Sequence, residues 1–282
     1  MGNRDLEYLR AKARRVREGI IRALGVNQRG HLGGSMSSAD LVTALYFYKM
    51  RHWPDNPQHP DRDRLIFSKG HSVLAQYAAL AECGYFPFED LPTTKQLGSF
   101  LQGHPEKDRT PGIEACTGSL GQGLSIGLGM ALAARLDRRD YKVYVILGDA
   151  ELAEGQIWEA VTAAAFYETD NLIALVDHNK MQATGKIADL YDVGNVAEKF
   201  AAFGWHVIQI DGHDLDQIEA AYAEARTVKG KPTVIISRGT KGKYVSFMEN
   251  KASWHGSAPN AEQYEQAMAE LKAILEKIEM EG

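Results

Sequence analysis

VYVILGDAELAEGQIWEAVTAAAFYETDNLIALVDHNK, residues 143–180, contains two short apolar runs separated by a longer segment of helical character. The first run, 143–147, ends in Gly148 and Asp149, and the second, 172–176, ends in Asp-His-Asn-Lys. Both runs are continuously apolar, as expected of strands in a parallel sheet that helices cover on both faces. The stretch therefore predicts a strand–helix–strand unit, with its helix over about 155–168.

The same alternation continues on both sides of this unit. Short apolar runs that end at turn residues predict strands, and apolar residues that recur near a period of 3.6 predict helices. Together they indicate an α/β fold: a parallel twisted sheet with helices on both faces, whose strands end at one edge. The further predicted elements are helices over 5–30, from Ser38 and Asp40 to Tyr48, 72–83, 195–203 and 214–228, and strands over 65–67, 206–210 and 233–237.

The chain shows no internal repeat and no low-complexity linker, so we expect residues 1–282 to form a single domain. Residues 261–282 are charged and amphipathic and predict a C-terminal surface helix. Residues 84–117 contain prolines at 87, 92, 105 and 111 and predict a long irregular loop. So long a loop within a compact domain usually has a function.

Composition argues against several classes of function. The net charge of −5, with acids and bases mixed along the chain, does not suit binding to nucleic acid or to an anionic membrane. The two cysteines, Cys83 and Cys116, lack the CxxC spacing of redox and zinc sites. We expect both to be reduced thiols in a cytoplasmic protein, because no secretory signal is visible at the N-terminus.

The most informative polar residues are Asp149 and Asn179, which follow two successive predicted strands. If those strands are neighbours, both side chains reach the carboxyl edge of the sheet. A carboxylate, an amide oxygen and a backbone carbonyl suit Mg²⁺ or Ca²⁺, and Mn²⁺ accepts similar ligands. A diphosphate would be the natural remaining ligand, and the helix beginning near Gly155 would favour an anion. Each motif taken alone also fits an ordinary turn.

With its spacing, this pair resembles the thiamine diphosphate motif, in which Gly-Asp-Gly after one strand is followed by Asn after the next. The resemblance implies that Asp149, Asn179 and the main-chain carbonyl of Met181 bind the metal ion, and that Gly148 and Ala150 lie beside the diphosphate. Ala150 stands where the family usually has glycine. If that position requires a positive φ, the methyl group should destabilise or shift the loop.

Four of the nine histidines occur in phrases that resemble those of transketolases: GHLGGSMSSADL with His31, DRDRLIFSKGH with His71, and GHPE with His104, followed by TGSLGQG. The fourth, His255, lies in WHGSAP after the last predicted strand. The resemblance implies that His71 and His255 contact the diphosphate, and that His31, His104 and His255 line the channel for the donor sugar. Imidazole suits this role because it exchanges protons near neutral pH.

Two further sites follow from the same resemblance. The backbone of Gly118 and Leu120 would contact the aminopyrimidine of the cofactor, and Ser119 replaces a usual proline there. Glu154 resembles the glutamate that links two active sites across a subunit interface. It fits equally well as an acidic residue that complements the dipole of the following helix.

The resemblance covers about residues 10–260 but only the first of three transketolase domains. It therefore implies the N-terminal subunit of a split transketolase, which binds thiamine diphosphate and Mg²⁺ and moves a two-carbon ketol unit between sugar phosphates. A separate C-terminal subunit would supply the pyrimidine-binding half in an α2β2 assembly. The alternatives are a subunit that uses another sugar class, the α subunit of a 2-oxo acid dehydrogenase, a deoxyxylulose-phosphate synthase and a non-catalytic cofactor-binding scaffold.

Overall fold

The computed structural model describes residues 3–281, so the extreme ends of the predicted 1–282 domain and 261–282 helix lie outside the described residues. Five parallel strands form one sheet in the order β1-β2-β3-β5-β4. The strands are β1 (Arg64–Phe67), β2 (Val143–Gly148), β3 (Leu172–His178), β4 (His206–Asp211) and β5 (Thr233–Arg238).

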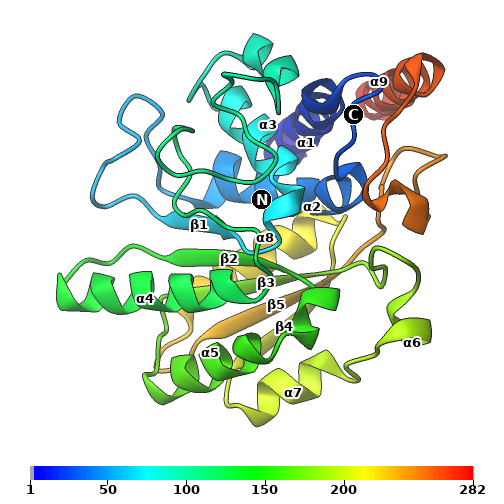
Figure 1. Cartoon of the computed structure of the whole chain (residues 1–282). Helices are drawn as coiled ribbons and strands as arrows, with labels where there is room; N and C mark the ends of the chain where they lie inside the picture. Colours follow the sequence, from blue (N-terminus) through cyan, green and yellow to red (C-terminus); the bar gives the residue numbers. More distant parts are fainter. Residues whose placement is uncertain (1–2, 282) are drawn as a thin grey trace.

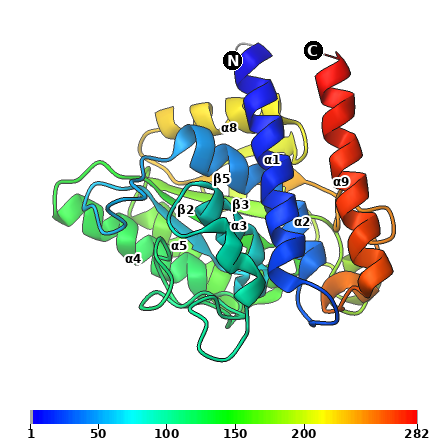
Figure 2. The same cartoon turned by 90° about the horizontal axis from the view of Figure 1, so that it is seen from above.

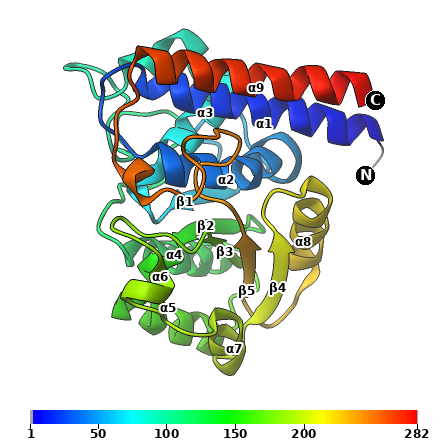
Figure 3. The same cartoon turned by 90° about the vertical axis from the view of Figure 1, so that its right-hand side faces the viewer.

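Helices cover both faces of this sheet, as predicted (Figure 1). They are α1 (Asn3–Leu24), α2 (Leu32–Ala44), α3 (Leu74–Glu82), α4 (Gln122–Leu136), α5 (Gly155–Phe166), α6 (Ile187–Leu190), α7 (Val196–Ala202), α8 (Leu215–Thr227) and α9 (Ala261–Glu281). Helices α4, α5 and α7 lie on one face, whereas α1, α2, α3, α8 and α9 lie on the other (Figures 1 and 3).

Alternate residues of each strand enter the two cores. Tyr144 and Ile146 of β2 pack with the α1–α3 layer, whereas Val145 and Leu147 pack with α4 and α5. Both faces of β2, β3 and β5 are therefore buried, which explains why their sequences are apolar without alternation. Strand β2 pairs with β3 from Val143 and Leu172 onward, so the ends that carry Asp149 and Asn179 are neighbours.

The two terminal helices lie side by side on the outer surface (Figures 2 and 3). Helix α9 buries Ala267 and Leu271 against the core that α1 also covers. Among the described residues, no helix combines the length and apolar character needed to cross a membrane.

Two predicted helix boundaries were wrong. The first helix ends at Leu24 rather than near residue 30, because Gly25 and Asn27 adopt positive φ values of 64° and 63°. The second helix starts at Leu32, so Ser38 and Asp40 lie within it. Their polar groups resemble a helix start in the sequence, but here they have tertiary partners instead. The predicted loop 84–117 is irregular except for a 3₁₀ turn at Phe88–Thr93.

Asp40 forms a buried ion pair that joins the helical layer to the sheet edge. Its two carboxylate oxygens accept hydrogen bonds from the Arg17 guanidinium, at 2.8 and 2.5 Å, and His213 Nδ1 lies 2.8 Å from Oδ2. Burial opposes the charged form of Asp40, but the Arg17 charge and His213 lower its pKa to about 2. The pair therefore connects α1, α2 and the turn after β4.

We expect this pair to make folding sensitive to acid. Because the pKa of Asp40 is lowered from 3.8 to about 2, its stabilisation is complete above the ordinary pKa and lost as the pH falls through about 2. The loss should reach about 2 kcal/mol. At neutral pH, Asp40→Asn should cost about 3–5 kcal/mol because it leaves Arg17 buried without its counter-ion.

Urea unfolding from neutral pH to pH 3 checks this, with Asp189→Asn, at an exposed carboxylate, as the control. The stability gap between the native chain and Asp40→Asn should narrow in acid, and a gap independent of pH would contradict the assignment.

Candidate functional site

The candidate site lies at the carboxyl edge of β2 and β3. Asp149 is only 4% exposed, and its Oδ1 accepts a hydrogen bond from the backbone N–H of Ala150 at 2.9 Å. Its Oδ2 accepts one from the backbone N–H of Lys180, the residue after Asn179. The two strand ends predicted to meet are thus in direct contact.

Asp149 is in an electrostatically unfavourable position. Burial, followed by repulsion from Asp177, raises the pKa of Asp149 to about 7, although two backbone N–H groups favour its charged form. Two carboxylates are buried near one strand edge, and the ion pair with Lys69 is formed by Asp177, not by Asp149. A bound cation would relieve this repulsion.

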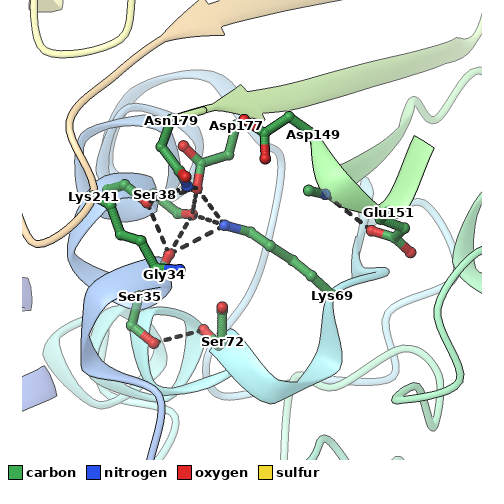
Figure 4. A network of polar contacts seen from close by, with 12 residues as sticks. Gly34, Ser35, Ser38, Lys69, Ser72, Asp149, Glu151, Asp177, Asn179 and Lys241 are labelled. Carbon is green, nitrogen blue, oxygen red and sulfur yellow. Dashed lines mark hydrogen bonds and ion pairs between the residues drawn. The ribbon is translucent and has the colours of Figure 1, made fainter. Parts of the chain in front are cut away.

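The side chain of Asn179 is oriented by a buried polar network (Figure 4). Its Nδ2 donates to Asp177 Oδ2 at 3.0 Å and to Ser37 Oγ at 3.3 Å. The same Asp177 oxygen accepts hydrogen bonds from the Lys69 ammonium and from Ser37 Oγ. Because the amide nitrogen faces Asp177, Oδ1 points the other way, where it accepts from the Met181 N–H at 3.1 Å.

Three oxygen donors of this edge suit a hard divalent cation: the Asp149 carboxylate, the Asn179 amide and the Met181 carbonyl. The raised pKa of the carboxyl and the fixed amide support the fit. Within the described part of the chain, no cluster of three or more His, Cys, Asp or Glu side chains could hold a metal ion.

Three of the four selected histidines form a cluster. The ring centroids of His31 and His71 are 4.8 Å apart, and the His255 ring lies 5.1 and 5.2 Å from them. Burial is the largest cause that lowers their pKa values, to about 4 for His31 and His255 and about 2 for His71. All three rings are therefore neutral near pH 7, and each keeps a nitrogen that can accept a proton or hydrogen bond.

His104 lies near this cluster, on the long loop, and is exposed. Its ring packs against Gly118, where a Cβ atom would come within 2.8 Å of His104 Cδ2. Gly118 also has φ of +154°, so the position favours glycine for both reasons. Leu120 is half-buried, and Glu154 is exposed at the start of α5, beside Gly121.

Ala150 does not strain the loop. Its φ is not positive; it begins a 3₁₀ turn, Ala150–Ala153, directly after Asp149. The loss of stability that we expected if this position required a positive φ therefore does not occur, because alanine adopts this backbone conformation readily. Gly148, the residue before Asp149, is half-buried, and its N–H donates to Glu151 Oε2 at 2.9 Å.

Sequence reasoning missed three buried charged residues of this site: Lys69, Glu151 and Lys241. Glu151 accepts hydrogen bonds from the backbone N–H groups of Gly121 and Gly148, at 2.8 and 2.9 Å, and joins the loops before α4 and after β2. Lys241 Nζ lies 2.9 Å from His255 Nδ1 and 3.3 Å from the Met181 carbonyl. Burial lowers the pKa of Lys241 to about 8.

Comparisons with known proteins agree on one family. A family model described as transketolase, thiamine diphosphate binding domain, matches residues 11–274. The chain is 41% identical over 278 residues to an apulose-4-phosphate transketolase subunit of Phocaeicola vulgatus, covering 99% of both chains. It is 44% identical over 268 residues to the 6-deoxy-6-sulfo-D-fructose transketolase subunit SqwG of a Clostridium species, covering 95% of this chain and 96% of that one.

The fold is also that of solved transketolases. The transketolase of Campylobacter jejuni superposes with a TM-score of 0.86 at 32% identity. The match covers 96% of this chain but only 43% of that one, so the present chain spans less than half of the single-chain enzyme.

The close contact between the segments that carry His71 and Gly118 generates a test. A Cβ atom at Gly70 would lie 2.6 Å from the Thr117 carbonyl oxygen, so Gly70→Ala should push the two segments apart. We expect a loss of about 1–3 kcal/mol in unfolding free energy, measured by chemical denaturation. Gly129→Ala, within α4 and with no atom within 4 Å of the added methyl, is the matched control and should be neutral or stabilising. Equal stability of the two variants would contradict the close contact.

Proposed function

Because this chain belongs to the transketolase thiamine diphosphate-binding domain family, we propose that it is the diphosphate-binding, N-terminal subunit of a two-chain transketolase. In this role it moves a two-carbon ketol unit from a ketose to an aldose. The observation that supports the proposal is the contact between the ends of β2 and β3 at Asp149 and Asn179, which Lys241 connects to the cluster of neutral histidines through the Met181 carbonyl and His255.

The residues that hold the cofactor divide into three groups in this proposal, according to whether they bind the metal ion, the diphosphate or the aminopyrimidine. Asp149, Asn179 and the Met181 carbonyl hold the metal ion, with Mg²⁺ preferred and Ca²⁺ or Mn²⁺ as alternatives. Gly148, Ala150, His71 and His255 contact the diphosphate, and the backbone of Gly118 and Leu120 contacts the aminopyrimidine. The buried Lys241 adds a positive charge next to His255 that suits a diphosphate oxygen.

Bound thiamine diphosphate would supply the carbanion chemistry that cleaves and forms the carbon–carbon bond. This chain's residues would orient the sugar and manage its protons. We propose that His31, His104 and His255 accept and return a proton at a sugar hydroxyl. His31 and His255 are neutral near pH 7, so each keeps a ring nitrogen that can accept a hydrogen bond from that hydroxyl. Glu154, exposed at the start of α5, would link two active sites across a subunit interface.

A partner subunit completes the proposed enzyme. Relatives of the same length are named as subunits, whereas the Campylobacter transketolase is more than twice as long. We therefore infer that a separate chain supplies the pyrimidine-binding half, in an α2β2 assembly. A cytoplasmic location also remains a prediction.

A second candidate concerns the sugar. The two relatives of equal length are named for apulose 4-phosphate and for 6-deoxy-6-sulfo-D-fructose rather than for common sugar phosphates. The same chemistry on a branched or sulfonated sugar is therefore the alternative substrate class. A non-catalytic scaffold is a third reading, which the activity measurement below separates from both.

The metal assignment predicts the effect of removing one ligand. Asp149→Ala should weaken metal-dependent binding of thiamine diphosphate by about 100-fold or more, because it removes the charged ligand of the proposed ion. Calorimetric titration with thiamine diphosphate, with and without Mg²⁺, measures this. Asp189→Ala, an exposed carboxylate on α6, is the control and should bind as the native chain does. Near-native affinity of Asp149→Ala would refute the ligand set.

The split predicts a separation of binding from turnover. The isolated chain should bind thiamine diphosphate and Mg²⁺ but transfer no ketol unit, whereas adding the partner chain should produce activity. Transfer to an aldose acceptor, followed by chromatography of the sugar products, is the assay. Full activity of the chain alone would overturn the two-chain proposal, and binding without activity in the complex would support the scaffold.

A further inference from the structure

A cavity of about 660 Å³ lies at the carboxyl ends of β3, β4 and β5. His178, Arg238 and Asp211 end these three strands and are paired in register across the sheet. They follow strand residues that face α4, α5 and α7, such as Val176 and Ile236. Asp177 and Asn179 instead contact Ser37 on the opposite face. His178 and Arg238 therefore lie on one face of the sheet, and the polar network that orients Asn179 lies on the opposite face.

The strand order favours a ligand site at this place. The chain passes from β3 through α7 to the edge strand β4, and then returns through α8, on the other face, to β5 between them. The segment after β5, with Val245 and Met248, packs in the same core as α8, so the connections that leave β3 and β5 run towards opposite faces of the sheet. In open α/β sheets, such a change of direction leaves a crevice at the carboxyl edge in which ligands bind.

The charged lining of the cavity is predominantly cationic. Lys180, Lys186, Arg238 and Lys243 line it, against one acid, Asp211. Over residues 3–281, no hydrogen bond or ion pair joins the ammonium groups of Lys180 and Lys186 to another residue. Arg238 donates to the neutral Gln209 at 2.7 Å, and Lys243 is a loose 3.9 Å from Glu249.

The polar atoms of the lining point to the same ligand chemistry. The carboxylate of Asp211 already accepts the backbone N–H of His213 at 2.9 Å, which reduces its repulsion of an anion. His178 Nδ1 is buried without a hydrogen-bond partner. A buried ring nitrogen without a partner is unfavourable. The His178 ring lines the cavity, and a rotation of the ring would bring this nitrogen to a bound oxygen atom as an N–H donor.

We propose that this cavity binds a small phosphate-type dianion, held by Lys186, Arg238 and His178. The volume also accommodates the organic part of a small phosphate ester. The cavity shares the turn Asn179–Met181 with the cofactor site, but its cations are not among the proposed cofactor ligands. The proposal goes beyond the proposed function, because it concerns a second anion at cations that are not assigned to the cofactor, and only the test with a filled cofactor site rests on that function.

Calorimetric titration of the full chain with inorganic phosphate tests the proposal, at fixed ionic strength and with saturating thiamine diphosphate and Mg²⁺. We expect saturable binding that weakens by about 100-fold in Lys186→Gln/Arg238→Gln, since each of the two lost charge-assisted hydrogen bonds costs about tenfold. The matched control, Lys229→Gln/Lys231→Gln, removes the same charge just before β5, at the opposite edge of the sheet, and should bind phosphate normally.

Further measurements identify the class of ligand and test whether the variants are folded. Glycerol 3-phosphate in place of phosphate distinguishes an ester site from a site for the free anion, according to which binds more tightly. Thermal denaturation and cofactor affinity should be unchanged in both double variants. If Lys186→Gln/Arg238→Gln does not fold, Lys186→Glu, at an exposed side chain, takes its place. Absence of saturable binding, equal weakening in the control, or binding abolished by thiamine diphosphate would overturn the proposal.

Discussion

The ion pair between Lys69 and Asp177 holds the candidate site together. Both side chains are almost fully buried, and they come from the segment after β1 and the end of β3. Burial alone would raise the pKa of Asp177, but the Lys69 charge and the hydrogen bonds from Lys69, Ser37 and Asn179 together lower that pKa, so the carboxylate stays charged. Removing either partner would leave an uncompensated charge beneath the sheet edge, which is strongly unfavourable.

Several parts of the site depend on this pair. Asp177 receives the hydroxyls of Ser37 and Ser38 from α2 and the amide of Asn179, so one carboxylate oxygen collects groups from separate segments of the chain. Lys69 also donates to the Gly34 carbonyl at 3.1 Å. The orientation of the proposed metal ligand and the position of α2 are therefore set by the same charge.

Much of the sheet could be predicted from the sequence because burial on both faces leaves a direct pattern. The runs 143–147 and 172–176 correspond to β2 and β3, and their polar ends meet as expected. The start of α2 could not be predicted, because Ser38 and Asp40 have the residue types of a helix cap but have tertiary partners. Local pattern cannot distinguish these two uses of a short polar side chain.

The residues at the strand ends and the histidines next to glycine could be selected from the sequence, and three of these histidines form a cluster in the structure. Lys69, Glu151 and Lys241 were missed because a lysine or glutamate is ordinarily a surface residue, and only the fold shows that these are buried. An acid directly after Gly-Asp-Ala was the one available signal for Glu151. The roles of Gly118, Leu120 and Glu154 rest on family resemblance, since contacts within this chain do not define them.

The neutral state of the histidine cluster affects how an anionic sugar would reach the site. Rings that carry no charge near pH 7 exert no long-range attraction, so they can act on a substrate only after contact. Attraction over a distance must come from lysines near the cluster, such as Lys95 and Lys241, or from another chain. Lysines would then attract the sugar, and histidines would exchange protons with it after it has bound. Added salt would lower the association rate of the sugar but leave the reaction of the bound sugar largely unaffected.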